Sequence, residues 1–217
     1  MLGFPKSTEF GKRIPKQKFY EKLKISSALR LVFQKQINTV YWRNKLSADT
    51  IHVAAGEWVQ EIEVFEIRLF QPQLEEAVLR QMDREIPYHI LFVLTCEGKA
   101  QAWIGYKEAA SGGKSAFKVN GYYHTGWMSE EELVLWLDGL NMDTVYENLV
   151  WQIAEMQGVV WRPDAGSAEN IRRKEKRQQL EKEIVALERK IRREPQLNRQ
   201  VEMNGRLKKL REEIEQI

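Results

Sequence analysis

The sequence is poor in cysteine and has no apolar segment long enough to cross a bilayer. Its one cysteine, Cys96, excludes an intrachain disulfide and a zinc site built from several cysteines. A single cysteine is typical of a reducing compartment, and the first residues lack the apolar core of an export signal. A membrane-spanning helix needs about 20 consecutive apolar residues, and no such run occurs. We therefore expect a cytoplasmic protein that does not contact a membrane.

The sequence also lacks the motifs that identify common catalytic and metal sites. Its three histidines, His52, His89 and His124, are far apart and show no ligand spacing. The G-x-S-x-G pattern of acyl-transfer enzymes is absent. These absences favour a protein that is not an enzyme and that holds neither a metal nor a cofactor.

What the sequence does contain is enough apolar material for one core and an appendage. Of its 217 residues, 43% are hydrophobic. Charge is unevenly distributed: residues 1–24 carry a net +5, residues 168–217 also carry +5, and the middle carries −7. Any contact with a polyanion is therefore expected to involve the ends of the chain.

The apolar patterns predict helices and strands in alternation. Helices are expected at 28–36, 73–85 and 144–157, with Ser26-Ser27 and Asp143 as caps, and strands at 37–42, 50–53, 57–70, 89–94, 101–106 and 117–123. A slip in the alternation near Phe65 predicts a bulge or a strong twist. The expected fold is mixed α/β (α+β), with a central mixed sheet flanked by helices.

The C-terminal tail has the pattern of two coiled-coil seams. Apolar residues recur at intervals of three and four in both halves of the tail: Leu180, Ile184, Leu187 and Ile191, then Met203, Leu207, Leu210 and Ile214. Pro195 lies between them and is incompatible with a helix interior. We expect an antiparallel, coiled-coil-like helical hairpin over 163–217, after an extended basic arm at 1–17 and a mixed α/β domain at 18–162.

Two binding surfaces follow from these patterns. Helices this short are marginal alone, so the seam residues Leu180, Ile184, Leu187, Ile191, Met203, Leu207, Leu210 and Ile214 are expected to bind a partner, the body or a second copy. The basic arm combines Lys12, Arg13, Lys16 and Lys18 with aromatic residues. Cations contact phosphates and aromatic rings stack on bases, so this arm is the expected nucleic-acid contact.

The order of elements from 28 to 94 resembles the core of restriction-endonuclease-like nucleases. Such a site needs acids that hold a divalent metal and a lysine beside them. The candidates are Asp49, Glu61, Glu66, Arg68 and Lys107, with Mg²⁺ as cofactor. Arginine stands where lysine is required, and arginine does not readily release a proton. The favoured interpretation is that Glu61, Glu63 and Glu66 form the polar face of a strand.

Several segments together resemble a bacterial family called domain of unknown function 4391. They are Pro5–Thr8, Ile14–Lys16, Phe19–Tyr20, Val59–Phe65, Ile86–Phe92, Tyr106–Lys107 and Glu194–Asn204. Members tend to sit beside helicases and DNA methyltransferases of restriction-like systems. The resemblance implies an accessory role in antiviral, restriction-modification-associated defence, with a helicase or methyltransferase as protein partner. It names no active-site residues. A structural homodimer joined through the tail is a third alternative.

Overall fold

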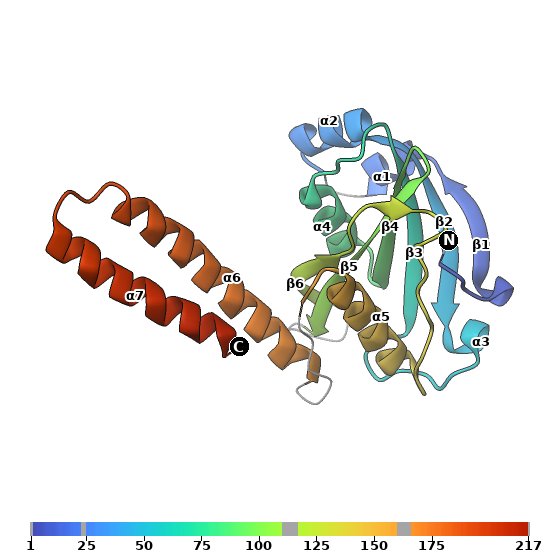
Figure 1. Cartoon of the computed structure of the whole chain (residues 1–217). Helices are drawn as coiled ribbons and strands as arrows, with labels where there is room; N and C mark the ends of the chain where they lie inside the picture. The colour runs from blue at the N-terminus through green and yellow to red at the C-terminus, as the bar shows by residue number, and fades with distance from the viewer. Residues whose placement is uncertain (1, 23–24, 110–116, 160–165, 217) are drawn as a thin grey trace. The chain divides into compact units, whose positions relative to one another are not determined.

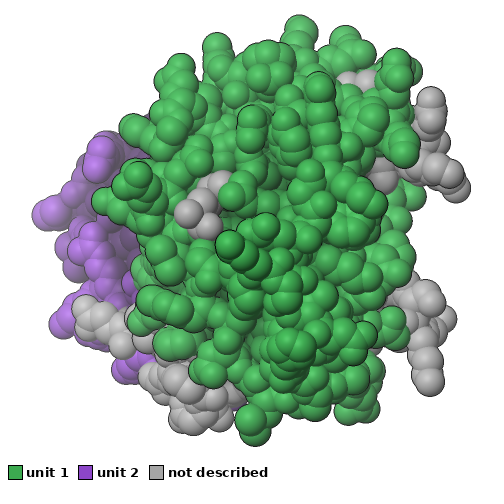
Figure 2. Space-filling view, turned by 90° about the vertical axis from the view of Figure 1, so that its right-hand side faces the viewer, with its two compact units in different colours: residues 1–160 green, residues 161–217 purple. Residues whose placement is uncertain are grey.

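A single twisted β-sheet organises the larger part of the computed structural model (Figure 1). The structure describes residues 2–22, 25–109, 117–159 and 166–216. The chain divides into two compact units, residues 1–160 and 161–217, which Figure 2 shows in green and purple. Residues 160–165, which include the end of the α/β domain expected at 18–162 and the start of the hairpin expected at 163–217, lie outside the described part of the chain.

Within the described residues the sheet has seven strands, and six of them follow one another in sequence order. These are β1 (Glu9–Ile14), β2 (Ile37–Ser47), β3 (Glu61–Leu69), β4 (His89–Cys96), β5 (Lys99–Ala109) and β6 (Phe117–His124), while β7 (Met128–Ser129) pairs with β5. Only β3 and β4 run parallel among these pairs. Helix α4 (Glu76–Glu85) makes the crossover between them that a parallel pair requires. The mixed α/β fold class predicted from the sequence is confirmed.

Helices cover both faces of this sheet. On one face, α1 (Lys16–Lys22), α2 (Ser27–Gln36) and α4 contribute to an apolar core that also contains Phe65 and Phe92. On the other face lies α5 (Met142–Met156), whose Tyr146 ring packs against His89 of β4. Because both faces are covered, all eight residues of β4 are buried, as its continuous apolar run predicts.

The N-terminal segment, expected as an extended basic arm over residues 1–17, is extended and is paired with the body of the protein. Leu2 is buried and hydrogen bonded to the backbone of Leu133, a 3₁₀ turn spans Lys6–Thr8, and Glu9–Ile14 pairs with β2 as an edge strand. The segment is extended, as predicted, but it is part of the sheet. Without this segment, β2 would be the edge strand and would leave backbone N–H and C=O groups unpaired. The proline and lysine content of residues 1–17 gives no sign of this pairing.

Two local predictions between residues 42 and 65 have different outcomes. The irregularity predicted near Phe65 is present, but the register shift lies on β2 between Trp42 and Asn44, opposite Phe65. The strand predicted at 50–53 is wrong, because residues Ala48–Ile51 form the short helix α3. Ser47 and Thr50 form a reciprocal capping box that starts this helix.

The second unit is a pair of helices joined by a short turn. Helix α6 spans Gly166–Ile191, α7 spans Leu197–Glu215, and Figure 1 shows them running antiparallel. Pro195 lies in the connection, as predicted. Ion pairs join the helices: Lys176 Nζ lies 2.8 Å from a Glu213 oxygen, and Arg211 Nη2 lies 2.8 Å from a Glu188 oxygen.

Candidate functional site

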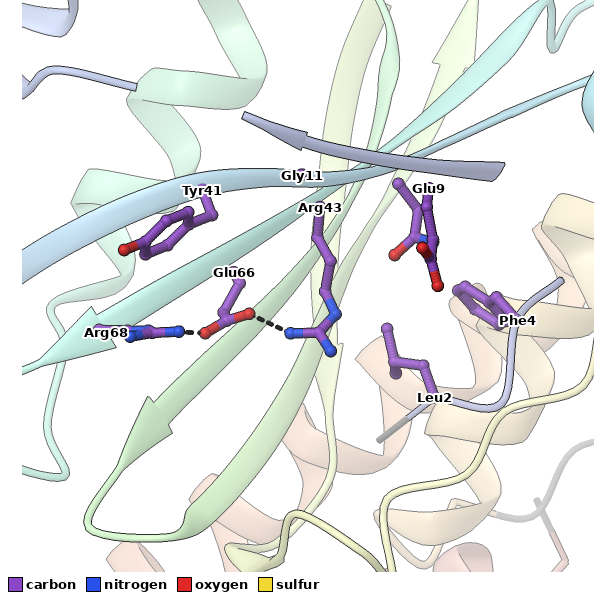
Figure 3. A pocket seen from close by; sticks show the side chains of 9 residues that line it. Leu2, Phe4, Glu9, Gly11, Tyr41, Arg43, Glu66 and Arg68 are labelled. Carbon is purple, nitrogen blue, oxygen red and sulfur yellow. Dashed lines mark hydrogen bonds and ion pairs between the residues drawn. The ribbon is translucent and has the colours of Figure 1, made fainter. Parts of the chain in front are cut away.

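An open pocket of about 350 Å³ lies on the N-terminal side of the sheet. Strands β1, β2 and β3 form its wall, and the N-terminal segment closes one end (Figure 3). Its lining is Leu2, Phe4, Glu9, Gly11, Tyr41, Arg43, Asn44, Glu66 and Arg68. Glu66 is 4% exposed, so this pocket is built around a buried carboxylate.

Two arginines hold the Glu66 carboxylate from opposite sides. Arg43 Nη1 donates to Oε2, and Arg68 Nε donates to Oε1 at 2.8 Å (Figure 3). The register shift in β2 makes Arg43 the extra residue opposite β3, which explains how it reaches Glu66. The hydrogen bond with Glu66 raises the pKa of Arg68. The Arg68 guanidinium also lies over the Tyr41 ring, with 4.6 Å between Cζ and the ring centroid.

This arrangement can donate hydrogen bonds, and its buried carboxylate is not a free base. Both Glu66 oxygens accept from guanidinium groups, which fixes the two arginines in place. Each guanidinium keeps further N–H donors, and the side chains of Arg43 and Arg68 are 36% and 52% exposed. Such a pair suits the recognition of a carboxylate or phosphate group better than proton transfer.

The structure brings together only part of the set considered for a nuclease-type site. Glu66 and Arg68 share the pocket, whereas Glu61 pairs with Lys45 at 2.9 Å and Asp49 lies exposed in the first turn of α3. Glu61 and Glu66 are five positions apart on one strand and therefore point to opposite faces of the sheet. Lys107 lies on the α4 face, away from Glu66.

A magnesium site of that type does not fit these residues. Two carboxylates must converge on the ion, and the only acid of the set in the pocket is Glu66, which is already engaged by two guanidiniums. Among the residues that the structure describes, no three His, Cys, Asp or Glu side chains gather as a metal site would require.

The four cations predicted to contact nucleic acid have different surroundings. Lys12 and Arg13 lie exposed on β1, and Arg13 pairs in register with Tyr41 at the pocket. The Lys12 ammonium lies over the Phe10 ring at 4.3 Å. Lys16 donates to the backbone carbonyl of Ile37, and burial lowers its pKa. Lys18 is exposed on α1.

A second polar cluster lies between α4 and the sheet and was missed from the sequence. Asp83 of α4 and Lys107 of β5 form an ion pair at 3.0 Å, and both side chains are fully buried. The Tyr122 hydroxyl donates to the second Asp83 oxygen, and Lys107 Nζ donates to the backbone carbonyl of Tyr88. Burial raises the pKa of Asp83 and lowers that of Lys107. A pair with no solvent exposure acts as a structural link rather than as a catalytic group.

The ion pair forms where the backbone of β5 at Gly105 comes close to the Asp83 side chain of α4. A side chain at Gly105 would place its Cβ 2.9 Å from Asp83 Oδ2 and 3.0 Å from the Tyr122 ring. Tyr146 supports the strand from the other face, accepting from the Lys107 N–H at 3.1 Å. The signal in the sequence was Asp83 itself, four residues after the buried Leu79 and thus on the apolar stripe of its helix.

His89, the most buried of the three histidines, belongs to the sheet rather than to a site. It is 3% exposed and contacts the Tyr146 ring edge to face. Burial, with a smaller effect of Lys107, lowers the pKa of His89 to about 3. Its imidazole is therefore neutral at physiological pH and acts as a packing group.

The predicted seam residues of the hairpin face one another. Leu180, Leu187 and Leu207 are buried, and Ile184, Ile191, Met203, Leu210 and Ile214 are partly buried. The apolar side chains that the outer surface exposes are different ones: Val185, Leu197 and Val201. A partner that binds the assembled hairpin would contact these outer residues.

The chain was compared with curated proteins, with solved structures and with models of protein families. The first two comparisons give no significant match. Among the described helices, none combines the length and apolar character needed to cross a membrane. The model of a family described as a domain of unknown function, DUF4391, matches residues 2–214, which is nearly the whole chain. The chain therefore belongs to the DUF4391 family.

Proposed function

We propose that this chain is a non-enzymatic accessory protein of a bacterial DNA-directed, restriction-like defence system. In this role it binds a partner helicase or DNA methyltransferase through the helical hairpin, and it contacts nucleic acid through its basic ends. The defence context comes from the family resemblance. The observation that carries the partner contact is the hairpin itself, a compact unit whose seam is already filled.

A hairpin with a filled seam is suited to docking because it is already ordered, so that little conformational freedom is lost on binding. Its helices are held by Leu180, Leu187 and Leu207 and by ion pairs between the helices. On α6, Val185 is 46% exposed and lies in a shallow hollow with Ala186, Glu181, Lys182 and Arg189. An apolar centre with a charged rim is the usual anatomy of a protein contact.

The body supports the non-enzymatic part of the proposal. Of the acids considered for catalysis, Glu61 and Glu66 lie in separate ion pairs and Asp49 lies exposed on α3, while the buried pair Asp83–Lys107 has no access to a substrate. The purified protein is expected to leave DNA intact in the presence of Mg²⁺. Cleavage that is lost in a Glu66→Gln variant would overturn this part of the proposal and support the nuclease alternative.

The test of partner docking is co-purification of the full chain with a helicase or DNA methyltransferase of a restriction-like system from the same bacterium. A Val185→Glu variant is expected to reduce capture at least about tenfold, since a charge in the contact centre disfavours burial. The matched control is Leu140→Glu, because Leu140 is 89% exposed on the first unit. Equal capture by both variants would contradict docking at Val185. Light scattering distinguishes the homodimer alternative, since the chain alone has a mass of 25.6 kDa.

A further inference from the structure

The turn of the hairpin carries a dense cluster of positive charge. Residues 189–199, which we call the hairpin tip, contain five cations and a single acid, Glu194. The cations are Arg189, Lys190, Arg192, Arg193 and Arg199, and all five are exposed. The tip therefore has a net charge of +4, close to the whole surplus of the second unit.

The tip differs from the rest of the hairpin in that all of its cations lack an acidic partner within the part of the chain that the structure describes. Elsewhere, Arg173, Lys176, Arg177, Lys208 and Arg211 each form an ion pair with a glutamate, whereas Arg172, Lys182, Arg206 and Lys209 form none with another described residue. None of the five tip cations has an ion pair or a side-chain hydrogen bond with another described residue. The one acid of the tip is engaged within the turn, since the Glu194 carboxylate accepts from the backbone N–H of Gln196 at 3.1 Å.

Helix stability does not account for this cluster. Cations in the last turn of a helix complement its dipole, which explains Arg189 and Lys190 at the end of α6. Arg192 and Arg193 follow the end of α6. Arg199 lies in the first turn of α7, where a cation is unfavourable and where no acid is present. Arg199 therefore has no favourable interaction with a helix dipole, and five like charges within eleven residues repel one another.

We propose that the hairpin tip binds the phosphate backbone of duplex DNA. Four of the five cations are arginines, whose planar donors match phosphate oxygens in pairs. The contact is independent of base sequence, because the tip offers charge rather than a set of groups that read base edges. An anionic membrane is a poorer fit, since the apolar seams of both helices are used within the hairpin. This inference rests on the nucleic-acid contact of the proposed function and locates it; Arg189 also lines the hollow at Val185, whereas Arg192 and Arg193 do not.

The experiment is a salt titration of binding between the full chain and a fluorescent duplex of random sequence. The tip variant is Arg192→Glu with Arg193→Glu. The control is Arg206→Glu with Lys209→Glu, which makes the same change in net charge at two exposed positions of α7. Circular dichroism checks that both variants keep their helices.

The tip variant is expected to bind at least about tenfold more weakly and to lower the slope of log K against log salt by about 1.8, as two lost phosphate contacts require. The control should lose much less affinity. No binding by the unchanged chain, an equal loss in both variants, or tip-dependent binding to phosphatidylserine vesicles but not to duplex would overturn the inference. Retained partner capture by the tip variant separates this result from the docking proposal.

Discussion

At the scale of single residues, three buried acids show three ways of keeping a carboxyl group out of water. Glu63, Glu66 and Asp83 are 2%, 4% and 4% exposed. Glu66 is held by two guanidiniums, and Asp83 by a lysine and a tyrosine. Glu63 has no comparable cation, and burial raises its pKa to about 7, with the nearby Trp42 indole offsetting only part of the rise.

The raised pKa of Glu63 makes stability depend on pH. Between pH 4.5 and about 7 the folded chain binds a proton that the unfolded chain releases. The free energy of unfolding therefore falls as pH rises through this window, by up to about 3 kcal/mol. Replacing the acid by an uncharged amide in Glu63→Gln is expected to remove this fall and to stabilise the protein at pH 8.

Urea unfolding at several pH values measures this effect. The control is Glu57→Gln, because Glu57 is exposed. The same pH slope in the unchanged protein and in Glu63→Gln would show that Glu63 does not take up the proton.

The pair Asp83–Lys107 predicts a different response to substitution. Lys107→Met leaves a fully buried acid without its cation and is expected to cost about 3–5 kcal/mol of unfolding free energy. Adding Asp83→Asn should recover most of the loss, because the uncompensated charge is then gone. The control is Arg84→Met, because Arg84 is exposed on α4, the helix that carries Asp83. This change should cost no more than about 0.5 kcal/mol of unfolding free energy. Equal losses for Lys107→Met and Arg84→Met would refute the structural role.

At the scale of elements, the sequence predicts those elements whose pattern is contained within their own residues. The apolar run of β4, the Ser26 cap of α2 and the two seams of the tail are all visible in the sequence, and the structure contains each of them. The sequence pattern predicts Asp143 as the cap of α5, but Asn141 caps this helix in the structure. Asp143 instead accepts the backbone N–H groups of Glu57, Trp58 and Val59, a contact between distant segments that no local pattern indicates.

The hairpin supplies a prediction at this scale. Leu187 is buried in the seam and Val185, two residues away on the same helix, is 46% exposed. Leu187→Ala is expected to destabilise the hairpin by about 2–5 kcal/mol, whereas Val185→Ala should have little effect. Hydrogen exchange measures both, since amides of α6 and α7 should exchange faster only in Leu187→Ala. Equal exchange in the two variants would mean that the seam does not hold the helices together.

At the scale of the whole molecule, the separation of charge is visible in the sequence. Composition alone places a basic tail after an acidic body. The sites were less accessible to sequence reasoning, because the face of a strand on which an acid lies depends on tertiary register. The sequence indicates Glu66 and Lys107 as candidate site residues, but it does not indicate their ion-pair partners Arg43 and Asp83. Which cations of the tail are left unpaired likewise depends on how two helices meet.

The edge strand β1 has a consequence for how this protein can associate. Its pairing with β2 is irregular between Glu9 and Lys12, Gly11 adopts φ +60°, and Lys12 and Arg13 are exposed. A strand from another chain added at this edge would meet a broken ladder and two positive charges. Sheet extension at β1, and aggregation by that route, are thus disfavoured. Any association at this edge is therefore expected to use side-chain contacts rather than added backbone pairing.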